Sequence, residues 1–97
     1  MKLNLKIVSI NPEGDGVTCL YINNMLHMYG DYYHNKIDDW IAGFVAGLNF
    51  DRPSTDNIEP ENWYVLGESY EDPDQLEDLM LNPPSVFAAL PALTQEY

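Results

Sequence analysis

Apolar and polar residues alternate at the start of the chain, over residues 2–10. Leu3, Leu5 and Ile7 fall on one face of this segment and its two lysines fall on the other, which is the period of two of a half-buried strand. Residues 11–16 contain one proline and two glycines, a composition typical of a turn. We expect a strand that ends in a turn.

Two further apolar segments, residues 17–22 and 25–29, predict a β-hairpin. The two asparagines between them tolerate left-handed backbone, as a tight hairpin turn requires. This turn predicts a register with Ile22 opposite Met25, Leu20 opposite His27 and Thr18 opposite Tyr29. The other face of the hairpin then carries Val17, Cys19, Tyr21, Leu26 and Met28. Both faces are fairly apolar, so the pattern does not decide which of them meets a helix.

Residues 36–48 have the periodicity of an amphipathic helix. Their apolar side chains form a single stripe at i, i+3, i+4, i+7, i+8 and i+11, made of Ile37, Trp40, Ile41, Phe44, Val45 and Leu48. We expect this stripe to pack on the sheet, and Trp40, like Trp63 later in the chain, to be a packing residue. Asn35 is the expected N-cap, and Asp38 and Asp39 lie in the first turn, where the helix dipole favours negative charge.

Four small residues flank this stripe: Ala42, Gly43, Ala46 and Gly47. Each glycine costs roughly 1 kcal/mol inside a helix relative to alanine, so a close contact should compensate for them. The pattern leaves open whether that contact is with the sheet or with another chain.

The second half of the chain predicts shorter elements. Residues 49–61 have the composition of a loop, and residues 62–66 predict a short fourth strand. A helix should begin with Asp72 as N-cap and Pro73 in the first position, and end near Leu81. Its inward side chains should be Leu76, Leu79 and Met80.

This order of elements predicts an α+β fold in a single domain, residues 1–97, with 92–97 as a loose tail. We expect an antiparallel three- to four-stranded sheet packed against one main amphipathic helix, plus one or two short C-terminal helices.

The charge of the chain is strongly negative and unevenly distributed. Sixteen acidic and four basic residues give a formal net charge of −12, and ten of the acids lie within residues 51–78 beside a single arginine. Such a field repels nucleic acid and anionic membranes and attracts basic protein surfaces, which argues against direct DNA or RNA binding. The seven tyrosines, three phenylalanines and two tryptophans indicate that the acids are displayed on a folded scaffold and not on a disordered tail.

The single cysteine, Cys19, cannot form an internal disulfide, which favours a reducing compartment. The sequence has no apolar run of membrane-spanning length and no signal-peptide core at its start. We therefore expect a soluble protein of the cytoplasm.

Known patterns for metal sites and catalysis fit poorly. A calcium loop starting at Asp72 fails at its fifth and sixth positions, and one starting at Asn11 lacks the acid at its twelfth. Zinc would need more ligands than Cys19, His27 and His34, and the hairpin register separates the first two. A nucleophile elbow and a glycine-rich phosphate loop are both missing from the sequence. We expect no metal, no cofactor and no enzymatic activity.

The acidic residues instead suggest protein binding. Carboxylates arranged on a folded surface can imitate the phosphates of a duplex, which carries one negative charge per roughly 1.7 Å, and so occupy the basic groove of a DNA-binding protein. Asp74, Glu77 and Asp78 share one face of the second predicted helix. The candidate partner-binding residues are Asp38, Asp39, Glu68, Tyr70, Glu71, Asp72, Asp74, Glu77 and Asp78. Tyr32 and Tyr33 are equally suited to packing or to an interface.

Three stretches, MKLNLKIVSINPEGDG, DDWIAGFVAGLNF and YEDPDQLEDLML, together resemble a phage-encoded anti-CRISPR protein of the type I-F inhibitor group. That group has no shared signature motif, so no site residue is carried over. The resemblance implies a monomeric DNA mimic that binds the large, PAM-reading subunit of the RNA-guided surveillance complex in the bacterial host cell and blocks target DNA. Two alternatives remain: an acidic adaptor or regulatory protein for another basic protein, and a structural phage protein that oligomerises through the Ala/Gly face.

Overall fold

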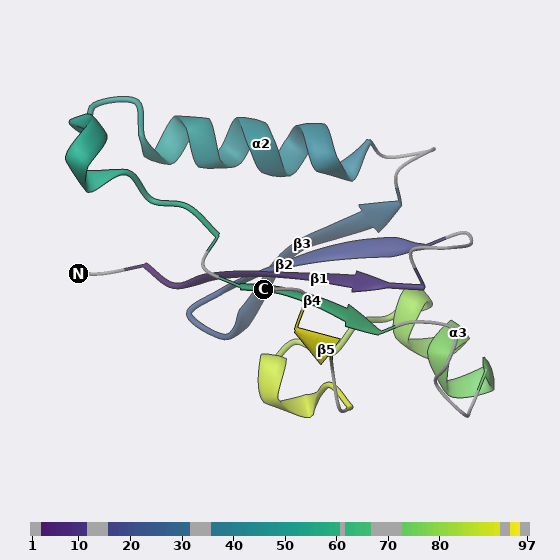
Figure 1. The fold of residues 1–97 in the computed structure, drawn as a ribbon. Coiled ribbons are helices and arrows are strands. Elements are labelled where there is room, and N and C mark those ends of the chain that lie inside the picture. The colour runs from purple at the N-terminus through teal and green to yellow at the C-terminus, as the bar shows by residue number, and fades with distance from the viewer. Residues whose placement is uncertain are drawn as a thin grey trace.

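The computed structural model describes residues 3–11, 16–31, 36–60, 62–66, 73–91 and 94–95. A mixed β-sheet lies between α2 (Ile37–Leu48) on one face and, on the other, α3 (Pro73–Leu81) with the segment that follows it (Figure 1). The molecule measures 44 × 27 × 22 Å. The predicted α+β class is confirmed.

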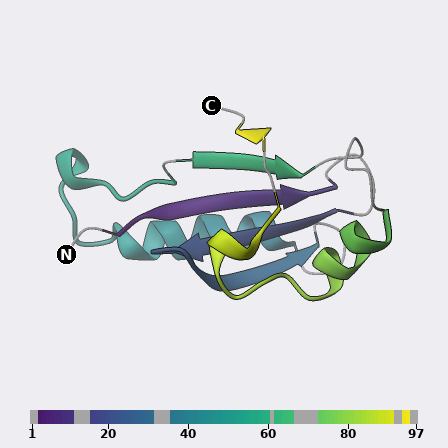
Figure 2. The same ribbon diagram turned by 90° about the horizontal axis from the view of Figure 1, so that it is seen from below.

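Five strands form the sheet, in the order β3-β2-β1-β4-β5. Their bounds are β1 Leu5–Ile10, β2 Val17–Ile22, β3 Met25–Asp31, β4 Asn62–Leu66 and β5 Thr94–Gln95. All neighbouring strands are antiparallel except β1 and β4, which are parallel. The sheet is therefore mostly, but not wholly, antiparallel as predicted. The parallel pair arises because α2 carries the chain back along the sheet after β3, so that β4 starts again from the end at which β1 starts (Figure 2).

The strand β1 is central and is buried on both faces, so the polar face predicted for this strand is wrong. The strand is also shorter than the predicted range of residues 2–10, since it begins at Leu5. Leu5 and Ile7 pack with α2, whereas Val8 and Ile10 pack with the C-terminal segment. Lys6 lies 4.3 Å from the centre of the Phe87 ring and donates a 2.7 Å hydrogen bond to Asn24 Oδ1. These contacts place an expected outward lysine beneath the C-terminal segment.

The hairpin turn is as predicted, but the register beyond it is not. Asn23 and Asn24 have φ values of 50° and 68°, and Ile22 pairs with Met25. A β-bulge then makes His27 an extra residue, so that Leu20 pairs with Met28 instead. Thr18 likewise pairs with Gly30, Met28 changes to the face of α2, and β3 continues to Asp31.

The helix α2 has the predicted extent, and its predicted stripe packs on the sheet except at Trp40. Ile37 and Ile41 are buried against Leu5, Ile7 and Leu20, with Phe44, Val45 and Leu48 partly buried beside them. Trp40, expected to pack, is 69% exposed. The residue before the helix is Lys36, with a left-handed φ of 50°, and the predicted N-cap Asn35 lies outside the described residues.

The opposite face of the sheet is covered by α3 and by residues 82–91. Leu76 is buried there, with Leu79, Met80 and Phe87 packed around the core of Val8, Ile10, Cys19 and Tyr21. Leu76, Leu79 and Met80 are the inward residues predicted for α3. The helix is followed by a short 3-10 turn, η2 (Phe87–Ala89), and two residues of the expected tail, Thr94 and Gln95, pair with β4. Trp63 on β4 is 37% exposed, so it is less deeply packed than expected.

Candidate protein-binding surface

The outer face of α3 is a short row of carboxylates. Asp74, Glu77 and Asp78 are all exposed, and none of their carboxylates makes a hydrogen bond or ion pair with the described part of the chain. Their spacing of three and four residues brings them onto one side of the helix because Leu76 anchors the opposite side in the core. Leu81 continues this row, at i+7 from Asp74, and is 72% exposed.

A second pair of carboxylates, Asp38 and Asp39, lies in the first turn of α2. Both are exposed, and within the residues that the structure describes neither has an ion-pair partner. The positive end of the helix dipole offsets part of the free energy of placing two acids there. The helix dipole therefore accounts in part for the acids of α2. It does not account for Glu77 and Asp78, which lie beyond the first turn of α3.

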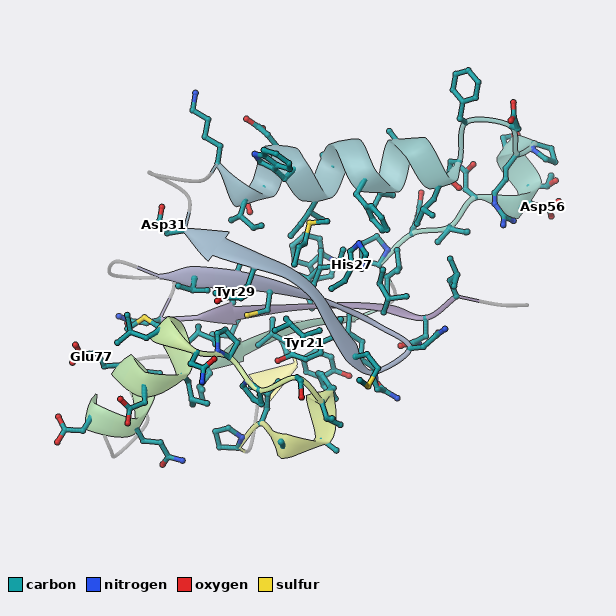
Figure 3. All side chains as sticks on the ribbon, turned by 180° about the vertical axis from the view of Figure 1, so that it is seen from behind. Tyr21, His27, Tyr29, Asp31, Asp56 and Glu77 are labelled. Atoms are coloured by element: carbon teal, nitrogen blue, oxygen red, sulfur yellow. The ribbon has the colours of Figure 1, made fainter. Side chains whose placement is uncertain are left out.

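Both groups of acids lie at the same end of the molecule. The strands β1, β3 and β4 finish at this end, where α2 begins on one face of the sheet and α3 lies on the other (Figures 1 and 2). Asp31, the last residue of β3, is at this end too, on the same side as Glu77 in Figure 3. Sequence reasoning missed Asp31 because the third strand was predicted to stop at Tyr29. We call Asp31, Asp38, Asp39, Asp74, Glu77 and Asp78 the acidic end.

The long acidic stretch of the sequence is divided by the fold. Asp56 lies at the far end of the molecule from Glu77 (Figure 3), in the exposed loop that also carries Asp51 and Glu59. Residues 51–78 therefore do not form one patch. The charge that is relevant to a single partner surface comes from α3 together with residues from the first half of the chain.

Four of the nine predicted binding residues cannot be placed. Glu68, Tyr70, Glu71 and Asp72 lie outside the described residues, as do Tyr32 and Tyr33. The remaining five, Asp38, Asp39, Asp74, Glu77 and Asp78, are all exposed and all belong to the acidic end.

Among the described basic side chains, only Lys36 lies at the acidic end, where it precedes Asp38 and Asp39 at the start of α2. Lys6 is bound to Asn24 and Phe87, and Arg52 donates a 3.2 Å hydrogen bond to the Leu48 carbonyl oxygen at the far end of α2. Within the described residues, no basic side chain pairs with the carboxylates of α3. The arrangement is suited to accepting charge-assisted hydrogen bonds from arginine and lysine.

The charge density of α3 is comparable with that of nucleic acid. From Asp74 to Asp78 the helix rises about 6 Å, so its three acids give about one charge per 2 to 3 Å of axis. A duplex has one charge per roughly 1.7 Å. Over one helical turn, the electrostatic field of α3 is therefore close to the field that a phosphate backbone would offer to a basic groove.

Cys19 and His27 lie on opposite faces of the sheet. Cys19 is fully buried on the C-terminal face of the sheet, and this burial raises the pKa of its thiol to about 12. His27 lies on the other face, with its ring 4.6 Å from that of Phe44. The two therefore do not form a nucleophile–base pair.

Among the described residues, no group of three or more His, Cys, Asp or Glu side chains is arranged to hold a metal ion. Within the same residues, no helix has both the length and the apolar character needed to cross a bilayer.

Comparison with known proteins adds no relative. No family model matches the chain, and neither a curated protein nor a solved structure is significantly similar to it.

Proposed function

We propose that this protein is a binding protein and not an enzyme, and that its acidic end occupies a basic surface that another protein uses to hold DNA. The observation that supports this most directly is the row of exposed, unpaired carboxylates on α3. The mutual repulsion of these acids does not favour folding, and a cationic partner would relieve that repulsion.

The shape of the acidic end supports the same proposal. Its acids are held on two helices that pack on opposite faces of one sheet, so their positions are fixed relative to each other by the buried core. A rigid display loses little conformational entropy on binding. Leu81, exposed beside the acids of α3, offers an apolar contact among the charged ones.

The first partner to test is the type I-F surveillance complex, which the sequence resemblance suggests. In this proposal the acidic end binds the large subunit where it reads the protospacer-adjacent motif, and the protein acts as an anti-CRISPR inhibitor by excluding target DNA. Its contacts replace phosphate–lysine and phosphate–arginine pairs, so binding should weaken as salt is added.

A competition assay tests this function. Purified type I-F surveillance complex is loaded with labelled target duplex, and the protein is titrated in at low and at moderate salt. Displacement that weakens with salt is the expected result. The protein alone should not shift the same duplex at physiological salt.

Two charge-reversal variants locate the surface. Asp74→Lys, Glu77→Lys and Asp78→Lys together should abolish displacement. The matched control is Asp51→Lys, Asp56→Lys and Glu59→Lys, which changes the net charge equally but at the far end. Equal loss in both variants would mean that net charge alone matters. Retained displacement in the α3 variant, with an unchanged circular dichroism spectrum, would refute the proposed surface.

A further inference from the structure

The outer face of α2 is not covered by any described part of the chain. Ala42, Gly43, Ala46 and Gly47 are all exposed, and a Cβ atom added to either glycine would meet nothing within 4 Å. Two large aromatic side chains stand near its two ends: Trp40 is 69% exposed and Phe50, just past the helix, is 85% exposed. The sheet therefore does not provide the close contact that the small residues of α2 would allow.

Leaving this face in water is unfavourable for two separate reasons. Each helical glycine destabilises the helix relative to alanine, and no contact with the described residues offsets this. Exposed aromatic surface adds about 25 cal/mol for each Å² that a partner could bury. Trp40 and Phe50 are also the kind of residue that dominates protein interfaces. The face therefore has the properties of a contact surface.

The charges at the two ends of this face indicate what covers it. Lys36, Asp38 and Asp39 lie at the beginning of α2, and Asp51 and Arg52 lie just after its end, all of them exposed. An antiparallel second copy of α2 brings Arg52 of one copy level with Asp38 of the other, and Asp51 level with Asp39. A parallel copy would instead bring Asp38 and Asp39 against their own equivalents. The antiparallel orientation therefore offers an opposite-charge pair, Arg52 with Asp38, that the parallel orientation lacks.

The spacing of the uncharged residues agrees with the same symmetry. A twofold axis level with residue 45 places Gly43 opposite Gly47, Trp40 about level with Phe50, and Asp38 about level with Arg52. Each residue then meets the same partner twice, as a closed twofold dimer requires. The two glycines fall where the helices would cross most closely, and antiparallel dipoles favour the pair.

We propose that the protein forms a homodimer through the outer faces of two antiparallel α2 helices. A dimer differs from the monomer expected from the sequence. It agrees with the alternative, given above, that the chain oligomerises through its Ala/Gly face. The acids of α3 lie on the opposite face of the sheet, so the dimer leaves them accessible, whereas Asp38 and Asp39 of the acidic end lie at the dimer contact (Figure 1). The proposal does not depend on the DNA-mimic function.

Sedimentation equilibrium of the full chain at physiological salt tests the dimer. A contact of one helix per copy is small for a specific interface, so the dissociation constant should be on the order of 10 µM. Trp40→Ala and Gly47→Leu should each weaken the dimer roughly tenfold or more, while circular dichroism stays unchanged because neither side chain is packed in the monomer. A chain that stays monomeric at about 100 µM would overturn the proposal.

A charge swap distinguishes this interface from any other mode of association. Arg52→Glu should weaken the dimer roughly tenfold, because both copies lose an ion pair and gain a repulsion. Adding Asp38→Arg and Asp39→Arg in the same chain should restore association. A dimer that is unaffected by Gly47→Leu and by Arg52→Glu uses another surface, and that result would also overturn the proposal.

Discussion

The hydroxyl of Tyr21 on β2 donates a 2.7 Å hydrogen bond to the carbonyl oxygen of Pro84, 63 residues later in the chain. The same tyrosine ring meets Phe87 edge to face, with ring centroids 5.6 Å apart. Two backbone hydrogen bonds fix the segment further, from Leu26 N to the Ser85 carbonyl and from Phe87 N to the Asn24 carbonyl. Residues 84–87 are thereby joined both to the face of the sheet and to its edge.

Replacing this tyrosine tests how much the hydrogen bond stabilises the fold. Tyr21→Phe leaves the Pro84 carbonyl without its partner in a partly buried site, so the free energy of unfolding should fall by about 1 to 2 kcal/mol. Urea unfolding followed by circular dichroism measures this change. The control is Tyr29→Phe, at a site that is 47% exposed, which should change stability by less than about 0.5 kcal/mol. Similar losses in both variants would show that the loss does not come from the hydrogen bond to Pro84.

Alkaline pH should destabilise the protein through Cys19 and Tyr21. Burial raises the pKa of Cys19 from 9.0 to about 12 and also raises the pKa of Tyr21 above its usual 10.0. The unfolded chain therefore loses these protons first, and stability falls as pH rises above 9. The slope approaches about 1.4 kcal/mol per pH unit for each group.

The measurement is the free energy of unfolding between pH 7 and pH 11. Cys19→Ala should remove the fall that begins near pH 9 and leave the part due to Tyr21, which begins near pH 10. An unchanged pH profile in Cys19→Ala would show that the buried thiol is not the group responsible.

Two glycines should respond oppositely to alanine. Gly43→Ala adds a methyl group that meets nothing within 4 Å, so helix propensity should raise stability by about 1 kcal/mol and the melting temperature by about 4 to 8 °C. Gly16→Ala would place its Cβ 2.5 Å from the Asn11 carbonyl oxygen and should destabilise by about 1 to 3 kcal/mol. Thermal unfolding at low chain concentration, where association is negligible, measures both. A loss of stability in Gly43→Ala under these conditions would mean that α2 is covered within its own chain.

The acids of α3 should oppose folding while supporting binding. Glu77→Gln with Asp78→Asn removes two charges from the second half of the helix, where the dipole disfavours them, and should stabilise the protein by about 0.3 to 1 kcal/mol at low salt. Added salt should reduce this gain by screening the repulsion. The same variant should compete less well for the surveillance complex. Lower stability at low salt would indicate that these acids have cationic neighbours within the chain.

Local pattern was enough for much of this fold. The period of apolar residues located α2, the apolar segment at residues 17–22 located β2, and the pair of asparagines located the hairpin turn. The inward residues of α3 followed from the same rule, since a short helix on a sheet buries one side. The exposure of the acids at positions 38, 39, 74, 77 and 78 followed too, because unpaired carboxylates remain in water.

Other features depended on contacts between distant segments. The bulge at His27 shifts the register after only two pairs, and alternation in the sequence carries no sign of an inserted residue. The contact of Lys6 with the Phe87 ring forms only once the C-terminal segment has docked on the sheet. Trp40 fits the helical stripe but lies at its margin and is left 69% exposed.

What the sequence determined by itself is the set of local elements and the excess of negative charge, because both depend on neighbouring residues and composition. Only the tertiary structure decided where that charge goes. The chain order joins Asp56 to Glu77 in one acidic stretch, whereas the fold sends them to opposite ends of the molecule and brings Asp38 and Asp39 to the end that holds α3. The physical reason is the parallel placement of β4 beside β1, which depends on burial of the sheet's two faces and not on any local preference.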